Sequence, residues 1–244
     1  MFKSIKKSIL KKINKRKQFF LFKQFISSGD GSFEVNWKNR FIILNENTSK
    51  TEFDRHYIYH PAWAARILSR IKPTVHYDIS SFLSFSTIVS AFIPVKFYDY
   101  RPAALSLSNL DSNHADLTQL NFDDNSIPSL SCMHTVEHIG LGRYGDEIDF
   151  FGDFKAMKEL ARVLAPNGNL LFVTPVGKKN IIQFNAHRIY EKDFVIKRFE
   201  DFGLKLVEFS LIPELAEDGG LVIDPSPKLL NQQSYACGCF WFTK

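Results

Sequence analysis

Apolar and polar positions follow a regular order from Lys72 to the end of the chain. Short apolar runs rich in β-branched and aromatic residues predict strands, and longer stretches with one apolar face predict helices. We expect strands over 74–80, 95–101, a short run ending at Asp116, 129–135, 169–176, 204–213 and 235–244, and helices over 82–92, 151–165 and 190–203. Strands that alternate with helices through short links predict an α/β fold with a Rossmann-like, doubly wound, mainly parallel sheet.

The chain before Lys72 is organised differently. A Gly-rich break at 29–32 separates a basic leader from two short predicted strands, FEVNW at 33–37 and RFIIL at 40–44. A helix is expected to begin at His60-Pro61, because Pro suits the first helical turn. The aromatic cluster at 56–60 either lines a pocket or caps the core. We therefore divide the chain into a basic amphipathic leader helix (1–28), an N-terminal extension (29–71) and a Rossmann-like domain (72–244).

The positive charge of the chain is concentrated in the leader. Residues 1–29 hold nine Lys or Arg and no acid, whereas the remainder has 22 basic and 26 acidic residues. A mildly acidic body argues against a nucleic-acid partner. Phe2, Ile5, Ile9 and Ile13 recur at helical spacing. This stripe predicts either contact of residues 1–25 with an anionic membrane surface or packing of the leader on the domain.

Cysteine usage indicates the compartment. Cys132, Cys237 and Cys239 are an odd number of thiols, and no secretory h-region or membrane-length apolar run is visible. This combination predicts reduced thiols in the cytoplasm, with the inner membrane face as the site of any peripheral contact. Cys237 and Cys239 are too closely spaced for the usual zinc knuckle, so we interpret them as core residues.

Three acids stand at the ends of successive predicted strands: Asp78, Asp99 and Asp116. The carboxyl ends of the strands in a doubly wound sheet line one crevice. An acid after the second strand can accept hydrogen bonds from two ribose hydroxyls, and an acid after the third can accept one from an adenine amino group. The spacing therefore predicts a nucleoside site.

The same residues carry a family resemblance. Asp78-Ile79-Ser80-Ser81, Asp99, Ala115-Asp116-Leu117, Glu137-His138-Ile139 and the stretch ELARVLAPNGNL at 159–170 resemble the class I S-adenosylmethionine-dependent methyltransferases. HTVEHIGLGRYGD, with FNAHRIY further on, resembles an uncharacterised methyltransferase-like family within that superfamily. The resemblance covers about residues 53–213.

The resemblance implies a seven-stranded sheet whose last strand is antiparallel, and S-adenosylmethionine as cofactor. Asp99 would hold the ribose hydroxyls and Asp116 the adenine amino group. The other implied cofactor contacts are Asp78, Ser80, Ser81 and Leu117, with the two serines near the methionine end. One departure stands out, because the first loop contains no glycine where such enzymes let the backbone approach the cofactor closely.

The stretch from Leu130 to Asp146 is predicted to supply the chemistry, as a buried strand that ends in a dense polar loop. Methyl transfer mainly requires alignment of the acceptor, with a base where the acceptor is a weak nucleophile. His134 is the first candidate base, followed by Glu137, His138 and His187. A small-molecule or saccharide acceptor would be bound by Arg143, Tyr144, Asn185 and Arg188.

Two other functions use the same residues. A binding protein could have kept the sheet and lost the reaction. Alternatively, His134-x-x-Glu137-His138 matches the spelling of an inverted zinc-peptidase motif, which places both histidines on one long helix. Gly140 and Gly142 follow directly and a strand-like run precedes, so a zinc hydrolase is the less favoured hypothesis. We accordingly predict no metal ligands.

Overall fold

The computed structural model describes residues 15–44 and 46–244. It divides into two compact units, Met1–Glu52 and Phe53–Lys244. The apolar stripe predicted at Phe2, Ile5, Ile9 and Ile13 lies outside the described residues. In the part of the chain that is described, no helix is both long enough and apolar enough to cross a membrane.

The first unit is a helix with a short aromatic contact. Residues 15–26 are helical, and Phe19 and Phe22 pack on Trp37 with ring centroids 4.9 and 5.2 Å apart. Trp37 belongs to the 3-10 helix η1 (Trp37–Asn39). The prediction of strands at 33–37 and 40–44 is wrong, since these residues are irregular apart from η1. A strand needs a hydrogen-bonded neighbour, and the described residues of this unit offer none.

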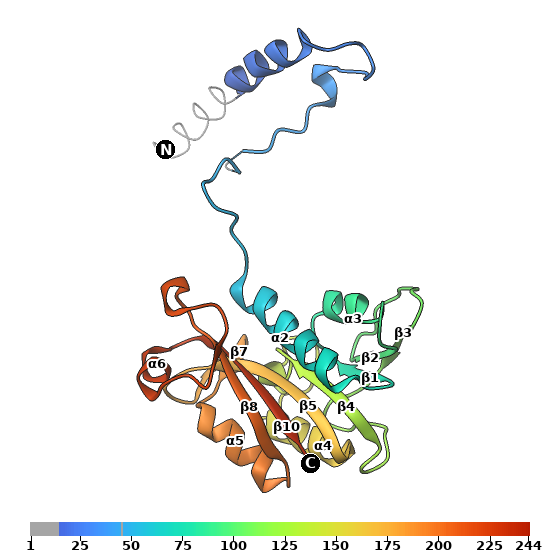
Figure 1. Ribbon diagram of the computed structural model, residues 1–244, viewed down its shortest axis with the longest axis vertical. Helices are drawn as coiled ribbons and strands as arrows, with labels where there is room; N and C mark the ends of the chain where they lie inside the picture. The colour runs from blue at the N-terminus through green and yellow to red at the C-terminus, as the bar shows by residue number, and fades with distance from the viewer. Residues whose placement is uncertain (1–14, 45) are drawn as a thin grey trace. The chain divides into compact units, whose positions relative to one another are not determined.

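The second unit is built on one twisted sheet, drawn in Figure 1. Its strand order is β3-β2-β1-β4-β5-β10-β8-β9. The pairings from β3 to β5 are parallel, and β10 runs antiparallel between β5 and β8. The bounds are β1 (His76–Ile79), β2 (Val95–Asp99), β3 (Leu110–His114), β4 (Ile127–Met133), β5 (Leu164–Val176), β8 (Lys205–Ile212), β9 (Val222–Ile223) and β10 (Ala236–Thr243).

This architecture confirms the predicted mainly parallel Rossmann-like fold with an antiparallel last strand. The sheet has eight strands rather than seven, because the two-residue β9 adds an edge beside β8. A separate hairpin of β6 (Ile181–Gln183) and β7 (His187–Ile189) was not predicted. The remaining short elements are η2 (Val136–His138), η3 (Ala216–Asp218) and α6 (Pro227–Gln232).

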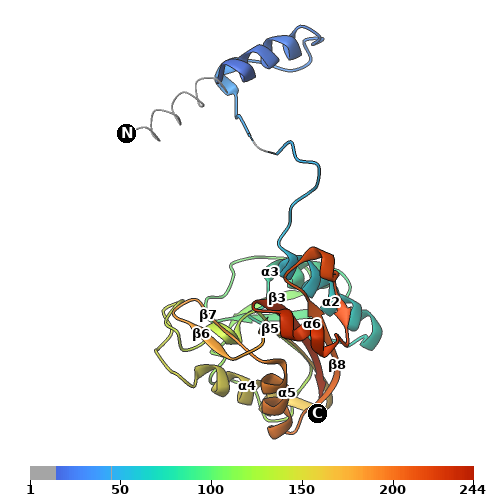
Figure 2. The same cartoon turned by 90° about the vertical axis from the view of Figure 1, so that its left-hand side faces the viewer.

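Helices cover both faces of the sheet. α2 (Arg55–Ile71) and α3 (Leu83–Val89) lie on one side, and α4 (Gly152–Val163) and α5 (Lys192–Asp201) on the other (Figure 2). Strand residues alternate between the two faces. In β5, for example, Leu170 and Phe172 pack in the core under α4 and α5, whereas Leu171 and Val173 pack under α2 and α3. Because both faces of the sheet are covered by apolar cores, the strand ends are where polar groups can gather.

α2 begins five residues before the predicted start at His60. The side chain of Asp54 accepts a hydrogen bond from the backbone N–H of Tyr57, so this acid caps the helix and Pro61 lies inside it. The earlier start places His56 and His60 one turn apart on the same helix face. Trp63, Ile67 and nearby apolar residues of α2 are buried in the core, so this helix is an integral layer of the second unit.

Candidate active site

Two cavities adjoin at the carboxyl ends of the parallel strands, and His134, His138 and Tyr144 line both. The first has a volume of about 480 Å³ and extends over the ends of β1, β2 and β3. The second, of about 850 Å³, lies between the start of α2, the 134–144 loop and the β6–β7 hairpin. Both volumes lie in the range of small-molecule sites.

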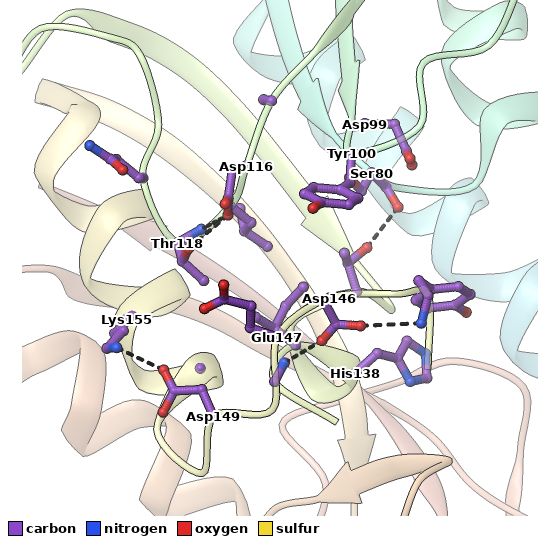
Figure 3. A pocket seen from close by; sticks show the side chains of 18 of the residues that line it. Ser80, Asp99, Tyr100, Asp116, Thr118, His138, Asp146, Glu147, Asp149 and Lys155 are labelled. Atoms are coloured by element: carbon purple, nitrogen blue, oxygen red, sulfur yellow. Dashed lines mark hydrogen bonds and ion pairs between the residues drawn. The ribbon is translucent and has the colours of Figure 1, made fainter. Parts of the chain in front are cut away.

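The first cavity contains carboxylates from two neighbouring strands (Figure 3). Asp99 ends β2, and its Oδ1 accepts a hydrogen bond from the backbone N–H of Arg101 at 2.7 Å. The Oδ1 of Asp116 accepts from both the N–H and the hydroxyl of Thr118, at 2.8 and 2.7 Å. Both side chains are therefore fixed by local turns, and the second oxygen of each carboxylate is not part of these hydrogen bonds.

The residues after β1 have divided roles. Ser80 lines the first cavity in a left-handed conformation with φ +57°, where glycine is favoured. Ser81 is buried, and its hydroxyl accepts from the N–H of Met133 at 2.9 Å. Asp78 is fully buried beneath the cavity and accepts hydrogen bonds from Ser86 and Ser131. Burial raises the pKa of Asp78 to about 6. Ser81 and Asp78 thus support the loop from below, while Ser80 and Leu117 reach the cavity wall.

Glycines and one acid shape the loop after β4. Gly140 has φ +79°, and a Cβ there would lie 2.0 Å from the carbonyl oxygen of Asp149. Asp146 accepts from the N–H groups of Gly140 at 2.7 Å and Gly142 at 3.3 Å through Oδ2, and from that of Tyr144 through Oδ1. Partial burial would raise the pKa of Asp146, but these amide bonds outweigh it and the pKa is lowered. The GLGRYGD run is therefore the sequence of a closed loop between the two cavities.

Histidines dominate the second cavity, where His134 meets a carboxylate. Its Nδ1 lies 2.8 Å from Oε1 of Glu137, and the two side chains are 5% and 1% exposed. His134 has φ +56°, so the chain turns sharply as it leaves β4. His138 is held separately, with its Nδ1 2.7 Å from the carbonyl oxygen of Ala186. His134 lies outside η2, so it does not share a long helix with His138, as a zinc-peptidase motif would require.

α2 supplies the opposite wall of the second cavity. The rings of His56 and His134 stack with centroids 5.2 Å apart, and Tyr57 lies 5.5 Å from His134. His56 also stacks on Tyr235, which lies just before β10. Burial lowers the pKa of His56 to about 4 and raises that of Tyr57 to about 12, so both are neutral at pH 7. The aromatic cluster at 56–60 thus lines a pocket through His56 and Tyr57.

The β6–β7 hairpin closes the cavity. Asn185 and His187 line it, and burial lowers the pKa of His187 below its usual value. The Nε2 of His187 is buried and has no hydrogen-bond partner among the described residues. Arg143 donates to the carbonyl oxygen of Ala186 at 2.9 Å and so ties the loop to the hairpin.

Arg188, expected to bind the acceptor, points away from both cavities and toward the 139–150 loop. Its guanidinium donates to the carbonyl oxygens of Ile139 at 2.6 Å and Phe150 at 3.1 Å, and Nε lies 3.5 Å from a carboxylate oxygen of Asp153. The side chain is buried and does not line either of the two cavities. Its position indicates that it anchors the 139–150 loop from behind.

The structure brings the expected residues together in three groups. Ser80, Asp99, Asp116 and Leu117 meet in the first cavity, and Glu137, His187, Arg143 and Asn185 in the second, with His134, His138 and Tyr144 between. Asp78, Ser81 and Arg188 lie behind the walls. Sequence reasoning missed Tyr235, which lines the second cavity, because nothing in its local pattern distinguishes it from the apolar strand that follows.

Comparison with known proteins adds the fold family. A family model described as "Caenorhabditis protein of unknown function, DUF268" matches residues 96–203, less than half of the chain. No curated protein sequence matches the chain.

Solved structures match over about three quarters of the chain. A 1,6-didemethyltoxoflavin-N1-methyltransferase from Burkholderia thailandensis, solved with 1,6-didemethyltoxoflavin and S-adenosylhomocysteine bound, is 10% identical with a TM-score of 0.52. The match covers 76% of this chain and 79% of that one. A candidate sarcosine dimethylglycine methyltransferase from Galdieria sulphuraria is 13% identical with a TM-score of 0.53, covering 75% and 84%. The [4+2]-cyclase SpnF is 11% identical with a TM-score of 0.51, covering 75% and 80%.

These similarities define the class of fold. The second unit has the fold of the class I S-adenosylmethionine-dependent methyltransferases. At such low identity the likeness concerns the fold alone, and a neighbour described as a cyclase illustrates that one fold supports more than one reaction.

Proposed function

We propose that this protein is an S-adenosylmethionine-dependent methyltransferase acting on a small-molecule or saccharide acceptor. The observation that carries the proposal is the shared wall of the two cavities at His134, His138 and Tyr144. A cofactor in the first cavity and an acceptor in the second would meet there, as the alignment of methyl donor and acceptor requires.

The donor set of the first cavity fits the cofactor. Asp99 and Asp116 present carboxylate oxygens at neighbouring strand ends, as a nucleoside requires, and Ser80 lies beside Asp99 (Figure 3). When bound, S-adenosylmethionine supplies a methyl group already activated by a sulfonium. The protein then has to orient the acceptor and accept its proton.

His187 is best placed to accept that proton. It lines only the acceptor cavity, its Nε2 is unpartnered among the described residues, and its lowered pKa keeps the imidazole neutral at pH 7. His134, the first candidate from the sequence, is the alternative base, because Glu137 holds its Nδ1 and its Nε2 is also unpartnered among the described residues. Arg143 and Tyr144 at the mouth would bind an anionic or hydroxylated acceptor.

Calorimetry with S-adenosylhomocysteine tests the proposal. We expect one site per chain, weakened tenfold or more in Asp99→Ala, since a hydrogen bond to a charged group contributes about 1.5–3 kcal/mol. Asp111→Ala is the matched control, because this exposed aspartate on β3 lies outside the cavity. Absence of binding by the wild type at millimolar ligand would favour a scaffold protein that has lost the cofactor.

The first unit has a separate proposed role, peripheral contact with the anionic inner face of a membrane. The support is a helix that carries Lys15, Arg16, Lys17 and Lys23 together with the exposed rings of Phe20 and Phe25. The three cysteines are free and buried, as expected for a protein of the reducing cytoplasm.

A further inference from the structure

Three side chains with metal-binding atoms converge beside the second cavity from distant parts of the chain. They are His56 at the start of α2, His134 after β4 and Cys237 on β10. One nitrogen of each imidazole and the Sγ of Cys237 all lie within 4.8 Å of one another. Three separate elements of the rigid fold thus bring two imidazoles and a thiol to one point.

The hydrogen bonds of His134 leave one nitrogen without a partner. Nδ1 is 2.8 Å from the carboxylate of Glu137, so it carries the proton and donates it. Nε2 then holds a lone pair and has no partner among the described residues. Water cannot easily replace that partner, because the side chain is only 5% exposed. An unpaired buried acceptor is costly. A carboxylate behind an imidazole is also the arrangement that orients histidine ligands of metal ions.

His60 repeats this pattern one helical turn from His56. Its Nδ1 lies 2.7 Å from the carbonyl oxygen of His56, while its Nε2 is buried and unpartnered within the described chain. Its ring centroid is 5.1 Å from that of His134. Glu137 adds a buried negative charge, and its Oε2 also has no partner in the described residues. A cation bound to His134 would offset this charge.

We infer that His56, His134 and Cys237 form a binding site for a transition-metal ion of the zinc type, open toward the second cavity. Two imidazoles and a thiolate are a donor set typical of zinc, and three protein ligands leave one coordination position free. Zinc bonds of about 2.0–2.3 Å require the donors to approach one another by roughly 1 Å. Binding converts the Cys237 thiol to a metal-bound thiolate and releases its proton to solvent.

The open position gives the site a role that rests on the proposed methyl transfer. His56 and His134 line the second cavity, so a fourth ligand would come from there. An acceptor oxygen or sulfur bound to the ion would lose its proton more readily, and His187 lies in the same cavity to take it. His138 is not part of the cluster, so this site differs from the His134-x-x-Glu137-His138 motif, and it departs from our expectation that the chain has no metal ligands.

Titration of the metal-free full chain with Co²⁺ tests the inference, because a cobalt–thiolate bond absorbs in the near ultraviolet. We expect one Co²⁺ per chain with this absorption band, and its displacement by Zn²⁺. Cys237→Ala should abolish the band. Cys239→Ala is the matched control, since Cys239 is equally buried two residues along the same strand but lies outside the cluster. It should keep the band.

His56→Ala provides an independent test that leaves the sheet untouched, and we expect Co²⁺ affinity to fall at least tenfold. If Cys237→Ala does not fold, the Co²⁺ affinity of His56→Ala is sufficient to test the site. A wild type that binds no Co²⁺, a band that persists in Cys237→Ala, or an unchanged affinity in His56→Ala would overturn the site. S-adenosylhomocysteine binding by the metal-free protein is measured separately, so failure of the metal site leaves the proposed methyltransferase testable.

Discussion

The Nδ1 of His134 and the Oε1 of Glu137 are joined by a 2.8 Å hydrogen bond at the wall shared by the two cavities. Glu137→Ala would leave the buried Nδ1–H of His134 without an acceptor. We expect the free energy of unfolding in urea to fall by about 1–3 kcal/mol. Glu137→Gln retains an acceptor oxygen and should lose less.

The control for that comparison is Glu147→Ala, an exposed acid of the same loop. Its unfolding free energy should change by less than about 0.5 kcal/mol. Equal urea midpoints for wild type and Glu137→Ala would contradict a structural role for the His134–Glu137 pair.

Ser80 occupies a left-handed position, which predicts a stabilising substitution. Its φ of +57° costs about 1–2 kcal/mol in a residue with a Cβ. Ser80→Gly should therefore raise the unfolding free energy by about 1 kcal/mol, less the small contribution of its 3.3 Å hydroxyl bond to Tyr98. Ser80→Ala keeps the strain and serves as control. A lower melting temperature in the glycine variant than in the alanine variant would argue against strain here.

The strand and helix pattern was predictable, whereas the composition of the second cavity was not. Strands such as β5 are predicted from continuous apolar runs, because both faces of the sheet are buried, and the acids Asp99 and Asp116 are recognised at the ends of such runs. The start of α2 was predicted too late because Pro61 is a strong local signal, while the cap at Asp54 is a common residue with several other roles. The lining of the second cavity depends on contacts between residues far apart in the chain.

Cys237 shows why such contacts stay hidden. It pairs in register with Ile212 and Pro175 in the centre of the sheet, so its sequence environment is that of a core residue. Its thiol meets His56 only because α2 packs on β10, 181 positions away in sequence. The Ser80 loop differs, because its lack of glycine is visible in the sequence, and the structure places Ser80 in the left-handed region that favours glycine.

Gly140 predicts a steric test of the loop between the cavities. A Cβ in Gly140→Ala would meet the Asp149 carbonyl oxygen at 2.0 Å, so the loop must shift. We expect a loss of more than about 2 kcal/mol in unfolding free energy, together with weaker S-adenosylhomocysteine binding. Gly145→Ala is the control, because it shares a positive φ of +87° but has no atom within 4 Å of the added carbon. Comparable losses in the two variants would show that backbone strain, and not the clash, is responsible.

His76 and Asp78 predict opposing pH effects on stability. Burial lowers the pKa of His76 to about 3 and raises that of Asp78 to about 6. Between pH 6 and 4 the unfolded chain binds more protons at His76, which destabilises the folded state as pH falls. Over the same range the folded chain binds more protons at Asp78, which stabilises it as pH falls.

Single variants separate the two effects. Relative to wild type, His76→Gln should gain stability as pH falls from 6 to 4, and Asp78→Asn should lose it, each by at most about 1.4 kcal/mol per pH unit. Urea midpoints at several pH values measure both slopes. Parallel curves for the three proteins would show that neither group is protonated differently on folding.

The basic first unit predicts binding to anionic vesicles by the full chain. Lysines and arginines near such a surface contribute about 1 kcal/mol each, so Lys15→Glu with Lys17→Glu should lower vesicle binding by at least tenfold. Phe20→Ser with Phe25→Ser should also weaken it, because both rings are exposed on the helix. Lys178→Glu with Lys179→Glu makes the same charge change on the second unit and should have a small effect. Co-sedimentation with vesicles of anionic and of neutral lipid measures each variant. Equal binding to both lipids would contradict an electrostatic contact, and equal loss in both charge variants would locate the membrane affinity outside this helix.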